Sequence, residues 1–469
     1  MDKHSSFAVS NPHKVPLDTI QKLGLWMGII GLMILTLATF NIHAEPKNVF
    51  AIVSIVLMLV GAIIYGRQTY IKSAPGIKNN HVWFKTLTNR GVIGWFLGVI
   101  LTLFYVLLYW FPKYLGLGIE GAENTGLIVM FDGLSQFFKG QPASQWFVYG
   151  TLYTLAIVSL GIKFMYKYRH NRYQLIRTVV VMACQLFLAY LIPEILEGLN
   201  TERPYFAKDI KNIWPLNYYF FESWHLDNMV NGGTLGMFYL VVGIFMFAVF
   251  TPIITYFVGK RWYCSWVCGC GGLAETAGDP FRHLSSKKLS AWKLERWLIH
   301  SVMVFIFVVT VAVLYGYFTG KGDVFGLSIY EYFSKPYGFL IGAMFSGVIG
   351  VGFYPMLGSR VWCRFGCPLA GYMGIIQRFK SRFRITTNGG QCISCGNCST
   401  YCEQGIDVRA YAQKGENIVR ASCVGCGICS AVCPRGVLKL ENGPEKGRIN
   451  PTDVLLGNDV DLMDLVNKR

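Results

Sequence analysis

The chain has 469 residues, of which 53% are hydrophobic and only 15% are charged, whereas about 25% of the residues in an ordinary soluble domain are charged. Its 43 Lys and Arg residues against 26 Asp and Glu give a net charge of +17. This composition excludes a simple cytosolic enzyme, a disordered chain and a secreted disulfide scaffold. The basic excess is typical of the cytoplasmic loops of a membrane protein, so we expect no nucleic-acid partner.

Eight apolar runs are long enough to cross a bilayer, which takes about 20 mostly apolar residues. They lie at 23–42, 49–66, 91–112, 147–166, 175–195, 235–258, 298–319 and 338–357. The polar residues 1–22 that precede the first run are expected to be an N-terminal segment and not a cleavable signal peptide. The lipid bilayer is therefore the first predicted partner.

The charges of the connecting loops predict the orientation of these spans. The loops at 67–90, 163–177 and 260–297 hold 17 Lys and Arg against 3 Asp and Glu. The four loops on the other side hold 8 basic and 11 acidic residues. Because basic loops stay in the cytoplasm, we expect a multi-pass protein of the bacterial inner membrane with both termini cytoplasmic.

The first five spans form an N-terminal transmembrane region at 23–234 with two long external loops. One of them, at 196–234, is rich in aromatic residues, which predicts either an interfacial belt or a docking surface for a periplasmic electron-transfer partner. A membrane core follows at 235–377, then a small soluble α+β domain at 378–442 and a polar tail at 443–469.

The soluble domain carries two identical cysteine blocks, each with the spacing Cys-x2-Cys-x2-Cys-x3-Cys. The first holds Cys392, Cys395, Cys398 and Cys402, and the second holds Cys423, Cys426, Cys429 and Cys433. This is the bacterial ferredoxin pattern for two 4Fe–4S clusters, in which the fourth cysteine of each block binds the other cluster. We therefore predict one cluster on Cys392, Cys395, Cys398 and Cys433, and the other on Cys423, Cys426, Cys429 and Cys402.

Other interpretations of these blocks fit less well. Zinc sites use paired Cys-x2-Cys units, and disulfides are disfavoured in a reducing cytoplasm. The second block ends in Pro434, whereas Glu403 follows the first. A proline here shapes a turn and is no ligand, so the sequence gives Glu403 no role.

Two further cysteine pairs follow the sixth and eighth spans, with Cys264 and Cys268 in the first pair and Cys363 and Cys367 in the second. Residues four apart share one face of a helix, so the two pairs could supply four thiolates to one site. A third iron–sulfur cluster is the leading interpretation, and a copper(I) or dithiol site is the alternative. Cys270 is an alternative ligand to Cys268.

Together these motifs resemble the NosR/NapH/MauN/CcoG group of membrane polyferredoxins. The resemblance covers roughly 235–442 and is closest to the NosR-type C-terminal half, in YCEQGIDVRAY and CVGCGICSAVCPRGV. Gly269 stands where the first membrane motif normally has Pro, and no segment is long enough for the periplasmic flavin domain of a typical NosR protein.

The resemblance implies electron transfer between the quinol pool, clusters at the cytoplasmic face and a periplasmic reductase. We therefore predict a membrane iron–sulfur subunit of a respiratory complex, with the quinone pool or a redox partner subunit as its electron-exchange partner. A factor that reduces copper for a respiratory metalloenzyme is the first alternative, and a redox sensor is the second. The catalytic residues and the direction of electron flow stay open.

Overall fold

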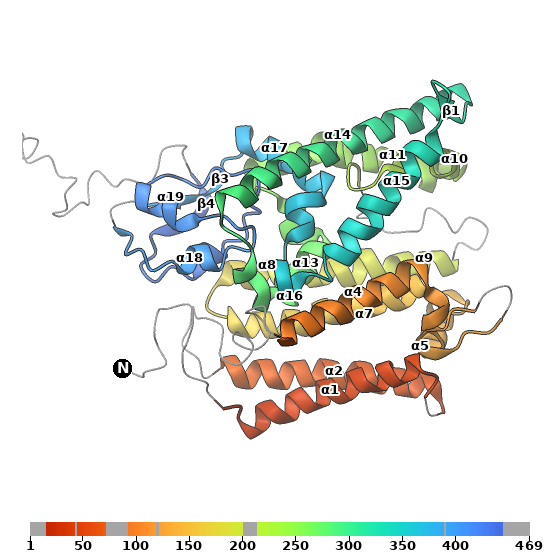
Figure 1. The fold of residues 1–469 in the computed structure, drawn as a ribbon, viewed down its shortest axis with the longest axis horizontal. Helices are drawn as coiled ribbons and strands as arrows, with labels where there is room; N and C mark the ends of the chain where they lie inside the picture. Colours follow the sequence, from red (N-terminus) through yellow and green to blue (C-terminus); the bar gives the residue numbers. More distant parts are fainter. Residues whose placement is uncertain are drawn as a thin grey trace, which may run out of the picture.

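The computed structural model describes residues 16–42, 45–71, 92–118, 122–199, 213–388 and 391–443. Most of these residues are helical, and Figure 1 shows long helices in layers with a small, mixed domain at one end. Of the predicted N-terminal segment 1–22 and polar tail 443–469, residues 1–15 and 444–469 lie outside the described residues.

Helices α1 (Thr19–Thr39) and α2 (Lys47–Tyr70) form a hairpin at one side of the molecule (Figure 1). Asp18 caps α1, because its side chain accepts the backbone N–H of Thr19 while Gln21 accepts that of Asp18. Two glycines let the helices touch: a Cβ on Gly61 would lie 2.6 Å from the carbonyl oxygen of Gly24. Small residues commonly allow such close approach between membrane helices.

The next layer holds α4, α7 and α8, with α8 continuing through a π-helical segment into α9. Their bounds are Val92–Trp110 for α4, Gln145–Lys167 for α7, Arg172–Ala183 for α8, Cys184–Leu191 for η2 and Ile192–Leu199 for α9. Short helices join α4 to α7: η1 (Pro112–Leu115), α5 (Gly126–Val129) and α6 (Asp132–Lys139). Helix α7 packs against both α2 and α13, so this layer connects the hairpin to the rest of the chain.

The third layer is the membrane core. It begins with η4 (Tyr218–Phe221) and α10 (Ser223–Asn231), and then α11 (Gly233–Phe245), η5 (Met246–Phe250) and α12 (Thr251–Phe257) follow as one helical run. Helix α14 (Leu289–Thr319) leads to strands β1 (Asp323–Val324) and β2 (Leu327–Ser328). The chain returns through η8 (Tyr330–Ser334), α15 (Lys335–Tyr337), η9 (Gly338–Ile349) and α16 (Tyr354–Leu357).

Six helical runs are long and apolar enough to cross a bilayer by length and composition: 19–39, 47–70, 145–167, 172–199, 233–257 and 289–319. The predicted third span coincides with α4, which offers a shorter apolar stretch, Gly94–Trp110. The predicted eighth span is displaced: its helical run begins at η8 and stops at Ile349, before Gly350. A Cβ on Gly352 would lie 2.6 Å from the Thr102 hydroxyl oxygen, so the chain turns where it presses against α4.

The aromatic loop that the sequence suggested as a docking surface packs partly inward. Tyr218 and Phe220 are buried, and the Tyr218 hydroxyl donates to the Ser334 carbonyl at 3.2 Å. The Trp214 indole N–H donates to the Thr310 hydroxyl at 3.0 Å. These contacts tie the loop to α14 and η8, while Trp224 remains 39% exposed. Residues 200–212 of the loop lie outside the described residues.

Two cysteine-bearing segments repeat one local fold. In each, a π-helical turn precedes the second cysteine and an α-helix follows it: η6 (Tyr263–Val267) before α13 (Gly269–Thr276), and η10 (Trp362–Gly366) before α17 (Pro368–Lys380). Cys268 and Cys367 are extended N-cap residues with ψ of 129° and 114°. The expectation that each pair lies on one face of a helix is therefore wrong, because the helix restarts at the second cysteine. A 3-10 helix, η7 (Asp279–Leu284), follows α13.

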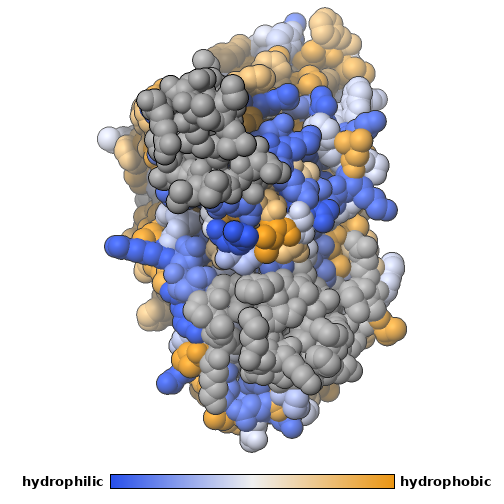
Figure 2. Space-filling model, turned by 90° about the vertical axis from the view of Figure 1, so that its left-hand side faces the viewer, coloured by the Kyte–Doolittle hydropathy of each residue, from blue (hydrophilic) through white to orange (hydrophobic). Residues whose placement is uncertain are grey.

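The small domain contains an antiparallel pair, β3 (Phe383–Thr387) and β4 (Leu438–Asn442), in which Ile385 faces Leu440. Three short helices complete it: α18 (Asn397–Thr400), α19 (Val408–Lys414) and α20 (Ile428–Ala431). Ile418 forms an isolated bridge to Ile385. The domain lies at the end of the helices that also holds the start of α1 (Figure 1). Seen from that end, hydrophilic residues gather across the face (Figure 2).

The glycine contact between α1 and α2 gives a stability prediction. Gly61→Ala should lower the stability of the purified protein by about 1–3 kcal/mol, because the new methyl group meets backbone and cannot be accommodated by a rotamer change. Gly28→Ala is the control, since nothing lies within 4 Å of a Cβ there. Thermal unfolding in detergent measures both variants. Equal melting temperatures for the two variants would contradict the close approach of α1 and α2 at Gly61.

Candidate iron–sulfur sites

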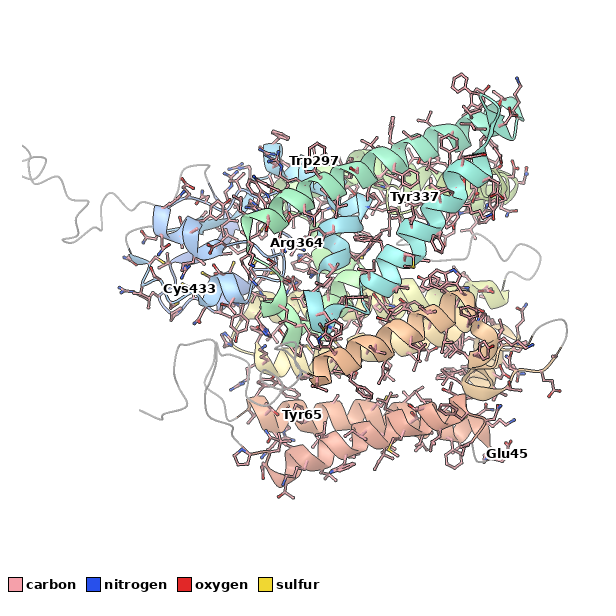
Figure 3. The ribbon with its side chains drawn as sticks, in the orientation of Figure 1. Glu45, Tyr65, Trp297, Tyr337, Arg364 and Cys433 are labelled. Atoms are coloured by element: carbon pink, nitrogen blue, oxygen red, sulfur yellow. The ribbon has the colours of Figure 1, made fainter. Side chains whose placement is uncertain are left out.

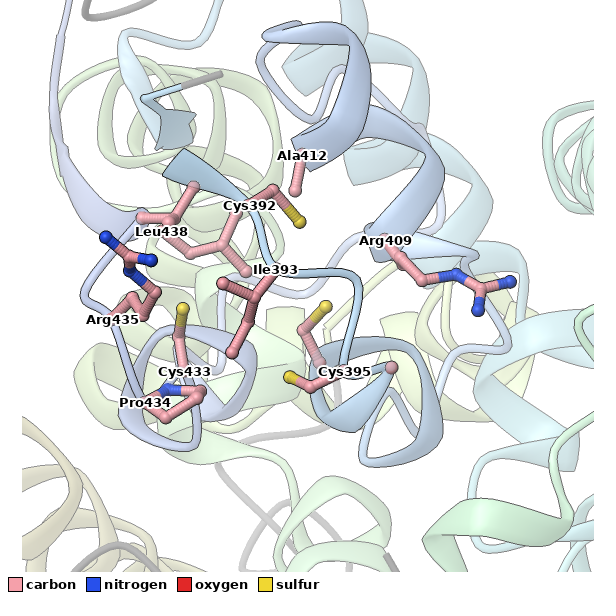
Figure 4. Close-up of a pocket in the computed structure, with 12 residues that line it drawn as sticks. Cys392, Ile393, Cys395, Arg409, Ala412, Cys433, Pro434, Arg435 and Leu438 are labelled. Carbon is pink, nitrogen blue, oxygen red and sulfur yellow. The ribbon is translucent and has the colours of Figure 1, made fainter. Parts of the chain in front are cut away.

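The first cavity lies in the small domain. Its lining includes Cys392, Cys395, Cys398 and Cys433, and Figure 4 shows the labelled cysteines around one space. Positive φ angles at Ser394 and Gly396 bend the chain between successive cysteines, which is the conformation that brings closely spaced thiols to one point. Cys395 is exposed and Cys398 is buried.

The lining of the second cavity includes Cys402, Cys423, Cys426 and Cys429. Gly425 and Gly427 have φ of 69° and 70°, so the chain turns here as it does in the first block. Each cavity thus takes three cysteines from one block and the fourth from the other, in the combination that the spacing predicts. That these eight thiols bind iron stays a prediction.

The third group of cysteines is buried between the two repeated segments. Cys264, Cys363 and Cys367 are at most 4% exposed and share one hydrophobic core, against which Cys268 and Cys270 pack. The Cys270 thiol lies within hydrogen-bonding reach of Cys268. These five residues are called the membrane cysteine cluster below. The structure brings together both predicted pairs and also the alternative ligand Cys270.

A third cavity lies between the membrane cysteine cluster and the aromatic loop. Its lining includes Cys270 and Trp362 together with Tyr218, Tyr219 and Tyr337. Tyr337 is 3% exposed, and its hydroxyl has no hydrogen-bond partner among the described residues. A buried phenol without a partner costs free energy unless a bound group accepts its hydrogen bond.

Among the described residues, no three His, Cys, Asp or Glu side chains are arranged to hold one metal ion directly. A cubane needs a different arrangement, because its four irons are bound by one thiolate each around a wider space. The two cavities in the small domain provide such a space, each surrounded by four cysteines.

The charges around the cysteines test whether anionic clusters fit these sites. Lys260 and Arg261 are 4% and 2% exposed, and no carboxylate of the described residues pairs with either. The Lys260 ammonium lies within hydrogen-bonding reach of Cys423 and also donates to the Ile418 carbonyl at 2.6 Å. Arg261 donates to the Cys363 carbonyl at 3.0 Å, while its Nε has no partner. A buried cation without a counter-charge is strongly unfavourable, so the residues fit anionic metal–thiolate centres at both places.

The thiols themselves are unlike free surface cysteines. Burial raises the pKa of Cys398 to about 12 and that of Cys426 to about 11. Burial also raises the pKa of Cys402. At neutral pH these groups would be protonated thiols in the empty protein, whereas metal binding removes the proton outright. Buried thiolates are therefore expected at these sites only when a metal is bound to them.

A buried ion-pair network, which the sequence pattern does not predict, joins the small domain to the membrane core. Glu403 is 1% exposed and pairs with Arg282 at 2.7 Å and with Arg360 at 2.9 Å. Although burial opposes ionisation, these two arginines hold the pKa of Glu403 below its usual value. A buried charge without a partner is rarely tolerated, so the glutamate in place of the turn proline was the signal that could have found the network.

The network extends into the N-terminal region, which the sequence left without a role. Lys167, at the end of α7, pairs with Asp279 at 2.6 Å, and Arg177 of α8 pairs with Glu275. Gln174 of α8 donates to the Cys426 carbonyl at 2.6 Å, and the Tyr173 hydroxyl donates to the Gly425 carbonyl at 3.0 Å. Helix α8 is thus hydrogen-bonded to the loop that lines the second cavity.

Comparisons with known proteins agree with this geometry. Residues 363–438 match a family of 4Fe–4S dicluster domains. Residues 240–290 and 338–386 each match a family of 4Fe–4S binding domains, so both halves of the membrane cysteine cluster fall within the same type of domain. The chain is similar to YccM of Escherichia coli K12, which is named as an electron transport protein, with 27% identity over 158 residues.

This similarity covers 32% of the chain and 43% of the relative's length. No solved structure matches the chain. The comparisons support an iron–sulfur protein related to electron transport, and the six apolar helices support a membrane protein. The closer resemblance to the NosR-type branch stays a prediction.

Replacing one cysteine of the second cavity tests the ligand assignment. Cys423→Ser should lower the iron content by about four atoms per chain, the content of one cubane. It should also make the small domain sensitive to protease, because the cluster joins separate segments. Cys184→Ser, in η2, is the control and should retain full iron. Unchanged iron and protease resistance in Cys423→Ser would show that the assignment is wrong.

Arg261 provides a test of charge at the membrane cysteine cluster. Arg261→Leu should reduce the iron retained there, because an anionic centre loses its buried cation, and Arg261→Lys should retain it. Iron content and thermal unfolding measure the effect. Without an anionic centre, an apolar side chain in place of an unpaired buried charge should stabilise the protein instead. A higher melting temperature with unchanged iron would therefore contradict the fit.

Proposed function

We propose that this chain is an electron-transfer subunit of a respiratory complex in the bacterial inner membrane. It would hold one 4Fe–4S cluster on Cys392, Cys395, Cys398 and Cys433, and another on Cys402, Cys423, Cys426 and Cys429. A third centre would lie on Cys264, Cys268, Cys363 and Cys367. Bound there, the clusters supply centres that accept and release one electron at a time.

The observation that carries this proposal is the continuity of the cysteine sites. The third cavity reaches Cys270, which contacts Cys268 within the membrane cysteine cluster. Arg360 joins that cluster to Glu403, the residue after Cys402. Figure 3 labels Tyr337 among the helices, Cys433 in the small domain and Arg364 between them.

An iron–sulfur centre is favoured over copper at the membrane cysteine cluster. Both cysteine pairs lie in segments that match a family of 4Fe–4S binding domains, and both segments have the same π-turn before the second cysteine. Such a repeat brings two thiols from each side to one place. A copper-reducing maturation factor and a redox sensor are the other outcomes of the experiment below.

A quinone fits the third cavity better than a polar substrate does. The cavity is lined mostly by apolar and aromatic residues, and apolar pockets with a few fixed polar groups are typical of such ligands. The unpartnered Tyr337 hydroxyl would donate to a quinone carbonyl oxygen. Oxidation of a quinol releases two electrons and two protons. The electrons would pass toward Cys270, which lines the same cavity, and the protons would leave to solvent.

The polar end of the molecule supports the predicted sidedness. The small domain lies at the same end as the basic segment around Lys167 and Arg169, and basic loops face the cytoplasm. We propose that this end is cytoplasmic and that both termini lie there. A periplasmic partner would then meet the opposite end, where Trp224 is partly exposed.

The proposal predicts exchange with a quinol analogue under anaerobic conditions. Added to the oxidised protein, the quinol should bleach the iron–sulfur absorbance, with dithionite as the control for full reduction. Tyr337→Phe should slow this reaction about fivefold, since one hydrogen bond contributes about 1 kcal/mol. Tyr332→Phe, at an exposed position nearby, should not change the rate.

Each other result favours a different function. Bleaching by dithionite alone would overturn the quinone proposal. Copper at the membrane cysteine cluster that is reduced and released on turnover would favour maturation. Reduction that changes only the binding of a partner, without steady electron flux, would favour a sensor.

A further inference from the structure

The buried ion pair between Glu403 and Arg360 has opposite charges facing two different cysteine sites. Glu403 lines the second cavity and is bonded through the chain to Cys402. Its carboxylate lies 2.9 Å from the Arg360 guanidinium. Both side chains are at most 1% exposed, so the pair is shielded from solvent.

Arg360 faces the membrane cysteine cluster. Its Nη1 donates to the Cys264 carbonyl at 3.2 Å and lies 3.9 Å from the Cys363 sulfur. It therefore contacts both repeated segments, one through each cysteine. The guanidinium and the carboxylate form a dipole that runs from the membrane cysteine cluster to the second cavity.

The net charge near an iron–sulfur centre helps to set its reduction potential. A nearby anion disfavours the added electron, and a nearby cation favours it. In a buried, low-dielectric site these effects are stronger than in water. Glu403 should therefore lower the potential of a centre in the second cavity, and Arg360 should raise that of a centre at the membrane cysteine cluster.

We propose that the Glu403–Arg360 ion pair biases electron transfer between the two sites, favouring the electron on the membrane cysteine cluster. This inference rests on the proposed function, because it requires redox centres at both sites. Lys260 and Arg282 also lie near the second cavity, and Arg261 lies near the membrane cysteine cluster. The Glu403–Arg360 pair therefore contributes only a part of the difference in reduction potential between the two sites.

The experiment is an anaerobic redox titration followed by electron paramagnetic resonance, with wild type measured first. Glu403→Gln should raise the potential of the second-cavity centre, and Arg360→Gln should lower that of the membrane centre. We expect each change to alter the electron distribution about tenfold, or about 59 mV for one electron. Glu403→Asp and Arg360→Lys keep the charges and should restore most of the wild-type difference.

Asp279→Asn is the matched control for a purely structural role. Asp279 is a buried carboxylate that pairs with the same Arg282, at 2.8 Å, but it lines neither cysteine cavity of the small domain. If the ion-pair network only stabilises the structure, Glu403→Gln and Asp279→Asn should cause the same loss of iron or the same shift in reduction potential. That result would overturn the proposal, as would loss of the clusters in both Glu403→Gln and Arg360→Gln.

The wild-type spectrum alone shows whether the proposed electron-transfer function fails. A wild-type protein without a redox-active centre at the membrane cysteine cluster gives no second signal to shift, which contradicts the proposed function before any variant is compared. Wild-type signals from both sites, with variants that leave both potentials unchanged, would contradict only the role of the ion pair.

Discussion

The arrangement of this protein depends on the compensation of buried charge where the small domain meets the membrane core. Four buried cations share three buried carboxylates in the described residues: Lys167, Arg177, Arg282 and Arg360 pair with Glu275, Asp279 and Glu403. Lys260 and Arg261 are also buried there and pair with no carboxylate of the described residues. Burying an unpaired charge costs several kcal/mol, so such an excess needs further negative charge. Iron–sulfur clusters bound by thiolates supply it. The same requirement explains why three separate parts of the chain, α7–α8, η7 and the first cysteine block, meet at one place.

This requirement links folding to redox chemistry. Lys260 and Arg261 are consecutive in the chain but contact different sites. The Lys260 ammonium lies beside Cys423 of the second cavity, and the Arg261 guanidinium donates to the Cys363 carbonyl of the membrane cysteine cluster. The protein therefore links its cysteine sites through buried charged side chains. A domain docked by such contacts cannot shift without separating charges, which keeps neighbouring centres at fixed spacing for electron transfer.

Much of the site could be predicted from the sequence, because cysteine spacing determines which thiols a short loop can bring together. The four-cysteine composition of each cavity in the small domain agrees with the prediction, including the exchange of Cys402 and Cys433. The sequence did not predict the role of Glu403, since its partners Arg282 and Arg360 are far away along the chain. It also misplaced the eighth span, because hydropathy does not show where η9 ends against α4. The first spans were given no role, although α8 contacts Cys426 through Gln174.

The most direct test of this account is the iron and acid-labile sulfide content of the anaerobically purified full chain, together with its electron paramagnetic resonance spectrum. Three cubanes predict about twelve iron and twelve sulfide per chain, with one set lost on substitution of Cys264 and Cys363. About eight of each, with no change in that double variant, would contradict a metal–thiolate centre at the membrane cysteine cluster. The buried cation Arg261 would then have no counter-charge.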